Sequence, residues 1–459
     1  MGKSDIREEQ NNDYLGSDSI GKLLFKLSVP AILAQIINLL YNIVDRVYIG
    51  HMAGDGALAL TGVGICMPVI MIVSAFAALI SNGGAPRASM AMGRGDNNTA
   101  EKILGNSFVV QIIISALLTV ILLIFNRPML MAFGASENTI GYASDYMVIY
   151  AIGTVFVQLT LGMNAFITAQ GFAKTGMLSV LIGAVCNIIL DPIFIYGFGW
   201  GVRGAATATI ISQAVSTIWV LSFLCGKKTI LHIKRKYMKP DAKVVIPGLT
   251  LGLAPFIMQA SESIIIVCFN SSLLKYGGDL AVGAMTILTS VMQFVMLPMQ
   301  GLGQGSQPLI SYNYGARNTV RVKKAFKLLL TASLIYSMAA WSILMIFPQG
   351  FARLFSSDIE LIAFTKNVLR IYIASIGVFG AQMACQMTFL SIGNAKASII
   401  VAVMRKFILL IPLIYVIPML VSNKAVGVYM AEPIADGLSV VFTVILFYFQ
   451  FKKAMRELQ

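Results

Sequence analysis

Long apolar stretches separated by short polar segments run through almost the whole chain of 459 residues. The charged residues fall in clusters, and the intervals between clusters are long enough for the roughly 20 apolar residues of a membrane-spanning helix. The pattern predicts an all-α membrane protein with twelve transmembrane helices. The expected spans lie near residues 24–49, 57–81, 103–126, 139–171, 175–198, 204–225, 246–273, 280–311, 325–346, 360–391, 397–421 and 426–451.

The composition excludes a soluble domain. Hydrophobic residues make up 57% of the chain and charged residues 12%, whereas soluble domains are about half apolar and about a quarter charged. We therefore expect a multi-pass protein of the cell membrane whose main partner is the lipid bilayer. The polar segment Met1–Gly21 predicts a short cytoplasmic tail and shows no signal peptide.

The net charge of +14 would suit either a nucleic acid or an anionic membrane surface, and its distribution decides between them. The N-terminal tail, the even-numbered connections and the C-terminal tail hold 24 Lys and Arg residues, and the odd-numbered connections hold five. Positive charge accumulates on the cytoplasmic side of membrane proteins. We therefore expect both termini and the basic segment 227–243 in the cytoplasm, and no nucleic-acid partner.

The cysteines and histidines give no sign of catalysis. The cysteines lie in apolar stretches without paired spacing, which indicates core packing and predicts neither a disulfide nor a metal cluster. The only histidines, His51 and His232, are predicted in loops on opposite sides of the membrane. No nucleophile with a neighbouring base is visible, so the sequence predicts that the protein is not an enzyme and needs no cofactor.

The chain is duplicated. A shift of 222 residues superposes eight identical residues, which indicates a repeat. The matched residues are Gly83, Pro86, Ser89, Gly93, Tyr150, Gly171, Ala173 and Lys174 with Gly305, Pro308, Ser311, Gly315, Tyr372, Gly393, Ala395 and Lys396. Pro30 and Pro255 open the two copies, although there the shift is 225. An even number of helices in each copy gives both copies the same direction of insertion.

The repeat predicts two pseudo-symmetric six-helix lobes that face each other across a central cavity. The expected organisation is a tail at 1–23, an N-lobe at 24–226, a basic cytoplasmic linker at 227–245, a C-lobe at 246–451 and a C-terminal tail at 452–459. Two similar lobes suit alternating access, in which one lobe rocks against the other. We expect a monomer.

Ionisable groups inside the predicted spans are candidates for function, because charge is costly in a membrane. Asp45 lies about twenty residues into the first span. Pairing with Arg46 at the interface is the structural alternative, but adjacent helix residues point about 100° apart. Asn187 and Asp191 share one helix face and precede Pro192, so their oxygens suit a proton or Na⁺. A polar cap at the helix end is the alternative there.

Other polar residues are open to two interpretations. Glu262 is either functional or a protonated side chain bonded to the polar residues around it in the seventh span. Glu432 and Asp436 share one face of the last span, where nearby Pro and Gly indicate a broken, wet segment. Arg405 and Lys406 are expected near a helix end, where long side chains reach the interface. The glycines at 301, 303 and 305 predict close helix packing.

The many Met and Phe residues, 25 and 26, favour a cavity that accepts varied lipophilic cations. With the duplication, the chain resembles the multidrug and toxic compound extrusion (MATE) transporters from about residue 22 to residue 451. The elements that carry the resemblance are Pro30 with Asp45, the segment Asn187-x-x-x-Asp191-Pro192, Gly204-Ala205-Ala206-x-Ala208-Thr209, and the paired segments Gly83 to Gly93 and Gly305 to Gly315.

This resemblance implies an antiporter that exports organic cations while H⁺ or Na⁺ enters. The N-lobe cation site of the family maps onto Asp45, Asn187, Asp191 and Thr209, where Na⁺ would be the only metal. Pro30 and Tyr146 are implied as further N-lobe residues.

A second site is implied in the C-lobe. Glu262, seven residues after Pro255, matches the C-lobe glutamate of the NorM-like branch. That branch also carries an acidic residue in its tenth helix, where this chain has only the amides Gln382 and Gln386. The difference favours coupling through the N-lobe.

Two other transport functions stay open. A lipid-linked oligosaccharide flippase of the same wider superfamily would be expected to carry more cationic groups in its cavity, and often more helices. A passive channel is less consistent with buried acids and two rocking lobes.

The charge distribution makes the topology testable. A single cysteine at position 235, in a variant without the native cysteines, should react with a membrane-impermeant maleimide only after the cells are opened, because the linker is expected in the cytoplasm. A cysteine at position 424, in an odd-numbered connection, should react in intact cells. Labelling of position 235 in intact cells would contradict the predicted orientation.

Overall fold

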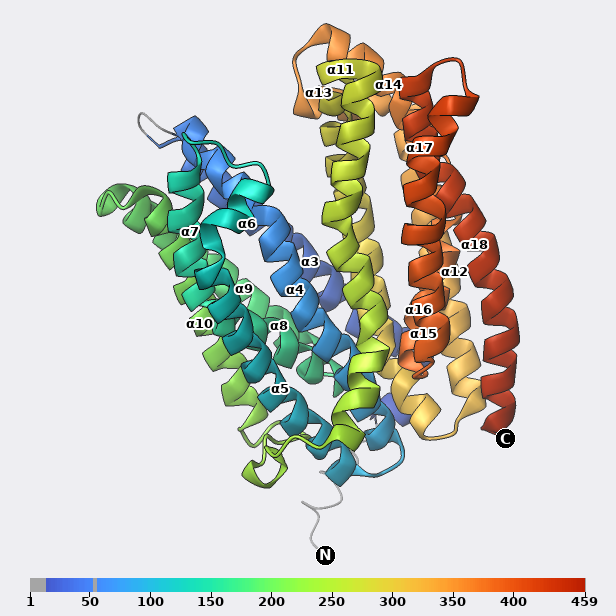
Figure 1. Cartoon of the computed structure of the whole chain (residues 1–459). Coiled ribbons are helices and arrows are strands. Elements are labelled where there is room, and N and C mark those ends of the chain that lie inside the picture. The colour runs from blue at the N-terminus through green and yellow to red at the C-terminus, as the bar shows by residue number, and fades with distance from the viewer. Residues whose placement is uncertain (1–13, 53–55, 459) are drawn as a thin grey trace, which may run out of the picture.

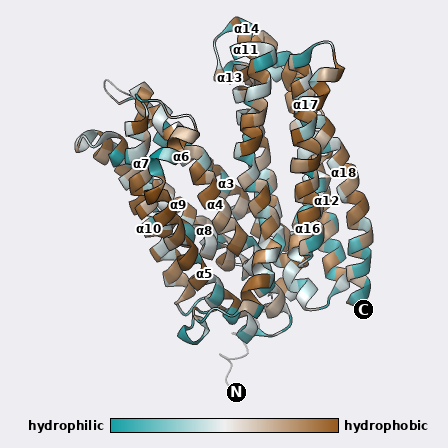
Figure 2. Ribbon diagram, viewed as in Figure 1, coloured by the Kyte–Doolittle hydropathy of each residue, from teal (hydrophilic) through white to brown (hydrophobic). Residues whose placement is uncertain are grey.

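A computed structural model describes residues 14–52 and 56–458, and within these ranges every regular element is a helix. Helices suit a membrane because each satisfies its own backbone hydrogen bonds where no water is present. In Figure 2, hydrophobic residues dominate the middle of the helices and hydrophilic residues collect towards their ends.

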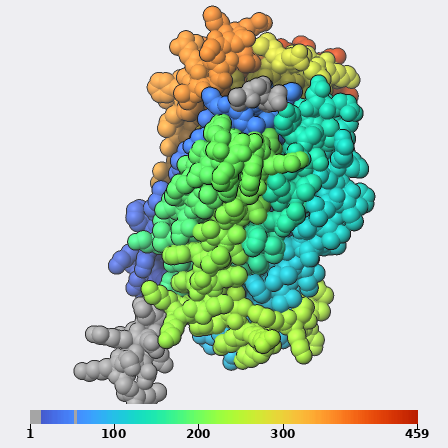
Figure 3. Space-filling view, turned by 90° about the vertical axis from the view of Figure 1, so that its left-hand side faces the viewer, coloured from blue at the N-terminus to red at the C-terminus, as the bar shows by residue number. Residues whose placement is uncertain are grey.

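The N-terminal half contains the helices up to residue 224. They are α2 (Tyr14–Ser17), α3 (Ile20–Gly50), α4 (Gly56–Gly93), α5 (Asn97–Ile124), α6 (Asn126–Ala132), α7 (Ile140–Ile152), α8 (Thr154–Ala169), α9 (Ala173–Pro192), the π-helix η1 (Ile193–Gly197) and α10 (Gly201–Leu224). Figure 3 looks at this half, with residues of α10 and the following linker towards the viewer.

The C-terminal half follows the 3₁₀ turn η2 (Arg235–Tyr237). Its helices are α11 (Ala242–Gly315), α12 (Thr319–Ile346), α13 (Pro348–Phe355), α14 (Ile359–Tyr372), α15 (Ile376–Ser391), α16 (Ala395–Val403), the π-helix η3 (Met404–Leu410), α17 (Ile411–Leu420) and α18 (Lys424–Glu457). α18 is continuous through Pro433 and Gly437, so the expected break in the last span is wrong.

The number of spans agrees with the prediction. Nine helices in the described ranges are long and apolar enough to cross a membrane, and two bent pairs, α7 with α8 and α14 with α15, each add one span. α11 holds two helices joined at Gly278, whose φ of 63° and ψ of −161° are not helical. Counting α11 twice, the described chain has twelve spans.

The two halves repeat one another in detail. The bent pairs stand at corresponding places and bend by 56° and 49°. Asp96 caps α5 and Asn318, 222 residues later, caps α12. Gly171 and Gly393 both have a positive φ, 93° and 75°, a conformation that glycine adopts without steric cost. The duplicated pair Gly171 and Gly393 is therefore explained by matching turns.

The two lobes meet at the end of the molecule that carries both described termini and diverge towards the other end (Figure 1). The contact between them, which we call the seam, is formed by α3 and α4 against α11. A Cβ on Gly83 would lie 1.9 Å from the carbonyl oxygen of Gly248, and one on Gly252 would lie 1.7 Å from that of Leu79. Only glycines permit backbones to approach this closely.

The seam also includes the duplicated glycines. A Cβ on Gly93 would meet the Tyr312 carbonyl oxygen at 2.0 Å, and one on Gly315 would meet that of Met90 at the same distance. Gly305 packs on the backbone of Ser28 in α3. The predicted role of the glycine-rich segment in close helix packing is confirmed.

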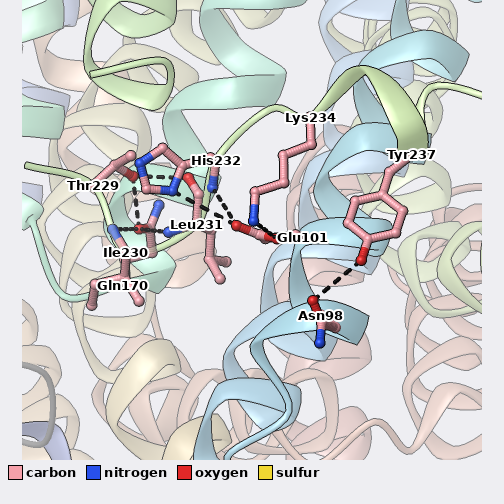
Figure 4. Close-up of polar contacts among 9 residues, drawn as sticks. All are labelled: Asn98, Glu101, Gln170, Thr229, Ile230, Leu231, His232, Lys234 and Tyr237. Carbon is pink, nitrogen blue, oxygen red and sulfur yellow. Dashed lines mark hydrogen bonds and ion pairs between the residues drawn. The ribbon is translucent and has the colours of Figure 1, made fainter. Parts of the chain in front are cut away.

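The linker is fastened to the N-lobe (Figure 4). Gln170 Oε1 accepts hydrogen bonds from the backbone N–H groups of Ile230 and Leu231, both at 2.8 Å. Glu101, buried at the start of α5, pairs with Lys234 at 2.7 Å. Further along, the hydrogen bond from Lys102 holds the pKa of Asp241 below its usual value. The linker therefore belongs structurally to the N-lobe, and the chain leaves that lobe where α11 begins.

The seam predicts a steric effect on stability. Gly252→Ala should lower Tm, because overpacking typically costs about 1–3 kcal/mol and the new Cβ meets rigid backbone. Gly64→Ala in α4 is the matched control, since a Cβ there has no neighbour within 4 Å. Size-exclusion chromatography of heated samples gives the Tm of each purified variant. Equal Tm values for the two variants would contradict the close contact.

Candidate ion site and buried charge network

Two carboxylic acids meet in the N-lobe where α3 packs against α9. Asp45 lies near the end of α3, and Asp191 lies near the end of α9 just before the π-helix η1. Both are buried, with 8% and 0% of the residue exposed, and their side chains lie close enough to interact directly. Arg46, by contrast, is exposed. The structure therefore brings together two acids that lie 146 positions apart, as the resemblance implied.

The polar neighbours of these acids come from α9 and α10. Asn187 lies one helical turn before Asp191, and its Nδ2 donates a hydrogen bond to Asp191 Oδ1 at 3.1 Å. The same Nδ2 lies 3.5 Å from Thr209 Oγ1 of α10. The four residues expected to form the N-lobe site thus form one cluster, which we call the N-lobe acidic site.

Within residues 14–52 and 56–458, no hydrogen-bond donor reaches three oxygens of the N-lobe acidic site. They are Asp45 Oδ1, Asn187 Oδ1 and Asp191 Oδ2, and all are buried. Buried polar atoms are nearly always paired, and each exception needs an explanation. Oxygen atoms of carboxylates and amides are the ligands of a proton or of a hard cation such as Na⁺. The arrangement has the chemistry of a site that takes up one cation.

The two further N-lobe candidates lie in different places. Tyr146 of α7 is buried, and its hydroxyl lies within hydrogen-bonding reach of Thr209, so it borders the site. Pro30 lies fifteen residues before Asp45 in α3, about 22 Å along the helix at 1.5 Å per residue. Pro30 therefore does not contact the acids, and any effect it has on them passes through the shape of α3.

The C-lobe treats buried charge differently. Glu262 of α11 accepts a hydrogen bond from Lys406 Nζ at 2.6 Å and forms an ion pair with it. This pairing is a correction of the interpretation that Glu262 is a protonated group bonded to its own polar neighbours. No local pattern signals this pair, because the two residues lie 144 positions apart in the chain.

Arg405 completes the C-lobe network. Its Nε donates to Asp436 at 2.6 Å, an Nη donates to Glu432 at 3.3 Å, and its guanidinium lies over the ring of Phe379. Arg405 and Lys406 are buried in the middle of the span from Ala395 to Leu420, so their expected position near a helix end is wrong. Partners on α11 and α18 make burial possible, because a buried charge is tolerated when it is paired.

The chain was compared with known proteins. The model of the MatE family matches residues 30–193 and again residues 254–416, one match in each lobe. Multidrug export protein MepA of Staphylococcus haemolyticus is 25% identical over 404 residues, 88% of either chain. MepA of Staphylococcus aureus is 23% identical over 435 residues, 95% of either chain.

Solved structures share the fold. A MATE protein in the bent conformation superposes with a TM-score of 0.90 at 23% identity and covers 96% of this chain and 97% of its own. An outward-facing multidrug resistance MATE transporter of the MOP superfamily gives a TM-score of 0.89 at 22% identity, with 97% and 99% covered. The double match to one family model and the twelve-helix, two-lobe fold lead to one conclusion: this chain belongs to the MatE family of membrane transporters.

Proposed function

We propose that the protein is a multidrug efflux antiporter that exports organic cations in exchange for H⁺ or Na⁺ by alternating access. The observation that carries the proposal is the pair Asp45 and Asp191 with three donor-free oxygens. Two carboxylates in a poorly solvated site disfavour double ionisation, so the site gains free energy from one proton or one bound cation. The exported drug and the ion would then compete for binding to the same one of the transporter's two conformations.

Export of drugs is supported by the relatives. The staphylococcal MepA proteins are multidrug export proteins that align with nearly the whole chain. The direction of transport depends on which end of the molecule faces the cytoplasm. If both termini lie in the cytoplasm, the lobes diverge towards the outside in this structure, and the N-lobe acidic site lies in the half of the membrane where entering ions arrive.

The C-lobe network supports coupling through the N-lobe. Each of its two cations already has an acidic partner, Lys406 with Glu262 and Arg405 with Asp436 and Glu432. The described spans therefore present no strongly cationic C-lobe surface of the kind expected for a pyrophosphate-carrying flippase substrate. Binding of an entering ion would release less free energy at a charge network that is already paired than at the donor-free oxygens of the N-lobe.

Substitutions distinguish coupling through the N-lobe from coupling through the C-lobe. Asp45→Asn and Asp191→Asn should each abolish gradient-driven drug efflux from proteoliposomes, because an amide cannot take up the coupling proton and binds a cation weakly. Glu262→Gln should do less damage. Asp145→Asn is the matched control, since Asp145 of α7 is a partly exposed acid that pairs with Arg203 near the start of α10. Normal transport by both N-lobe variants, or loss of ion dependence in Glu262→Gln alone, would refute N-lobe coupling.

The same proteoliposomes identify the ion and the substrate. An H⁺ gradient and a Na⁺ gradient are imposed separately, and the efflux of an ethidium-like dye is followed. We expect one of the two gradients to drive efflux and the other to have little effect. If neither gradient drives efflux of any cationic dye and an undecaprenyl-linked saccharide is moved instead, the protein is a flippase.

A further inference from the structure

The short helix α2 lies at the junction of the two lobes, at the end of the molecule where the seam closes. Its residue Leu15 is 2% exposed and belongs to one cluster of buried residues with Ala173 of the N-lobe and Val322 of the C-lobe. Isolated helices shorter than about 12 residues are marginal in water. The single turn of α2 therefore depends on its contacts with the lobes.

The carbonyl end of α2 is held by the C-lobe. The last carbonyl groups of a helix have no partner within the helix. Arg321 Nη2 of α12 donates hydrogen bonds to the carbonyl oxygens of Leu15 at 3.0 Å and Asp18 at 2.8 Å. Asn313 Nδ2 of α11 also donates to Leu15 at 3.0 Å, and Asn313 Oδ1 accepts a hydrogen bond from Arg321 Nε at 2.8 Å. The guanidinium is thus fixed in place, and charged donors form stronger hydrogen bonds than neutral ones.

The other end of α2 contacts the N-lobe. The hydroxyl end of the Tyr14 ring lies against Gly171, in the turn between α8 and α9, and a Cβ on Gly171 would lie 1.7 Å from the Tyr14 hydroxyl oxygen. Lys26 Nζ of α3 lies 4.8 Å from the centre of the same ring, a cation–π contact. α2 therefore touches the N-lobe through Tyr14 and the C-lobe through its carbonyl groups.

Both contacts of α2 fit only the state in which the lobes meet at the seam. Asn313 directly follows Tyr312, whose carbonyl oxygen faces Gly93 of the N-lobe in the seam. From Tyr14 to Asp18 a helical chain covers only about 6 Å. In this form α2 loses one of its two contacts when the seam separates. A contact that exists in one of two states shifts the equilibrium towards that state.

The linker contains a counterpart of α2. The turn η2 precedes α11, the first helix of the C-lobe, as α2 precedes α3, the first helix of the N-lobe. η2 is fastened to α5 of the N-lobe, where Asn106 Nδ2 donates to the Tyr237 carbonyl oxygen at 3.0 Å. α5 and α12 are equivalent helices of the repeat, 222 residues apart. Each lobe thus begins with a short turn that is fastened to the other lobe.

We propose that α2 is a clasp between the lobes, in which Tyr14, Leu15 and Arg321 hold the transporter in the state closed at the seam end. One end of the clasp detaches each time the lobes rock, so its strength sets the share of molecules that are open at the seam end. The inference rests on the alternating access of the proposed function and adds residues outside the ion site that control it.

Distances between the lobes test the clasp. Lys174 and Lys396 are equivalent exposed residues of the repeat, at the starts of α9 and α16, and form the seam pair. Glu137, between α6 and α7, and Glu360 of α14 are exposed at the diverging end and form the far pair. Each pair is replaced by cysteines and spin-labelled in the full-length protein without its native cysteines, reconstituted in nanodiscs. Double electron–electron resonance then gives the distance distribution.

The two ends of the clasp are weakened in turn. Arg321→Gln removes the charged donor, and Tyr14→Ala removes the ring from Gly171. Each should raise the ratio of seam-open to seam-closed molecules about tenfold, which corresponds to a contact of about 1.4 kcal/mol. The seam-pair distance should lengthen in the added population, and the far-pair distance should shorten.

The double variant Tyr14→Ala/Arg321→Gln separates a clasp from two independent contacts. A clasp holds only while both ends are attached, so the double variant should match either single variant, whereas independent contacts would give additive effects. Lys323→Gln is the matched control, because it removes one positive charge from an exposed position of α12. Its distance distributions should be those of the wild type.

The outcomes distinguish the clasp from the proposed function. The clasp is overturned if Arg321→Gln and Tyr14→Ala keep the wild-type distances, if the two pairs do not change in opposite directions, or if the single effects add. The two substitutions act at opposite ends, so either one tests the clasp if the other variant does not fold.

Efflux of a cationic dye from proteoliposomes is measured in parallel. If the wild type exports the dye under an ion gradient while the clasp variants keep the wild-type distances, the antiporter function stands and only the clasp fails. If the distances change as expected but the wild type exports no cationic dye under either gradient, the clasp stands and the proposed drug antiport fails.

Discussion

The glycine seam between the lobes is the constraint on which the rest of the structure depends. α4 and α11 approach so closely at Gly83, Gly252 and Gly315 that any larger residue would meet backbone atoms. This contact closes the molecule at one end, so the other ends of the lobes diverge (Figure 1). A state open at the opposite end would require the seam to separate, and small residues make it a shallow contact that the lobes can leave without extracting large side chains.

The two lobes share one fold but use buried charge in opposite ways. In the N-lobe, Asp45 and Asp191 face each other and leave oxygens without donors. In the C-lobe, Arg405 and Lys406 neutralise the acids of α11 and α18. Charge in a membrane must be paired, protonated or bound to an ion. The pseudo-symmetric lobes thus differ in their buried charge: the first holds two acids without a basic partner in the ion pairs of the described residues, and the second holds acids and bases that are already paired.

The sequence predicted the features that depend on local pattern. Apolar stretches predicted the twelve spans because a bilayer requires them, and the duplicated glycines predicted the repeat because turns and close packing need that residue. The pairing of Glu262 with Lys406 depends on how distant helices pack, and no local pattern encodes it. The expected position of Lys406 near a helix end is wrong for the same reason, because the acid that permits its burial lies on another helix. The grouping of Asp45 with Asp191 came only through the family resemblance.

The central claim is that one exchangeable cation at the N-lobe acidic site is linked to drug binding. If drug binding lowers the affinity of this site for the ion, thermodynamic linkage requires that ions leave the site when the drug is added. The direct measurement is the release of H⁺, or of radioactive Na⁺, when a cationic dye is added to purified protein. The account predicts release of one of the two ions from the wild type and none from Asp45→Asn/Asp191→Asn. Equal release from the double variant, or no release of either ion from the wild type, would contradict it.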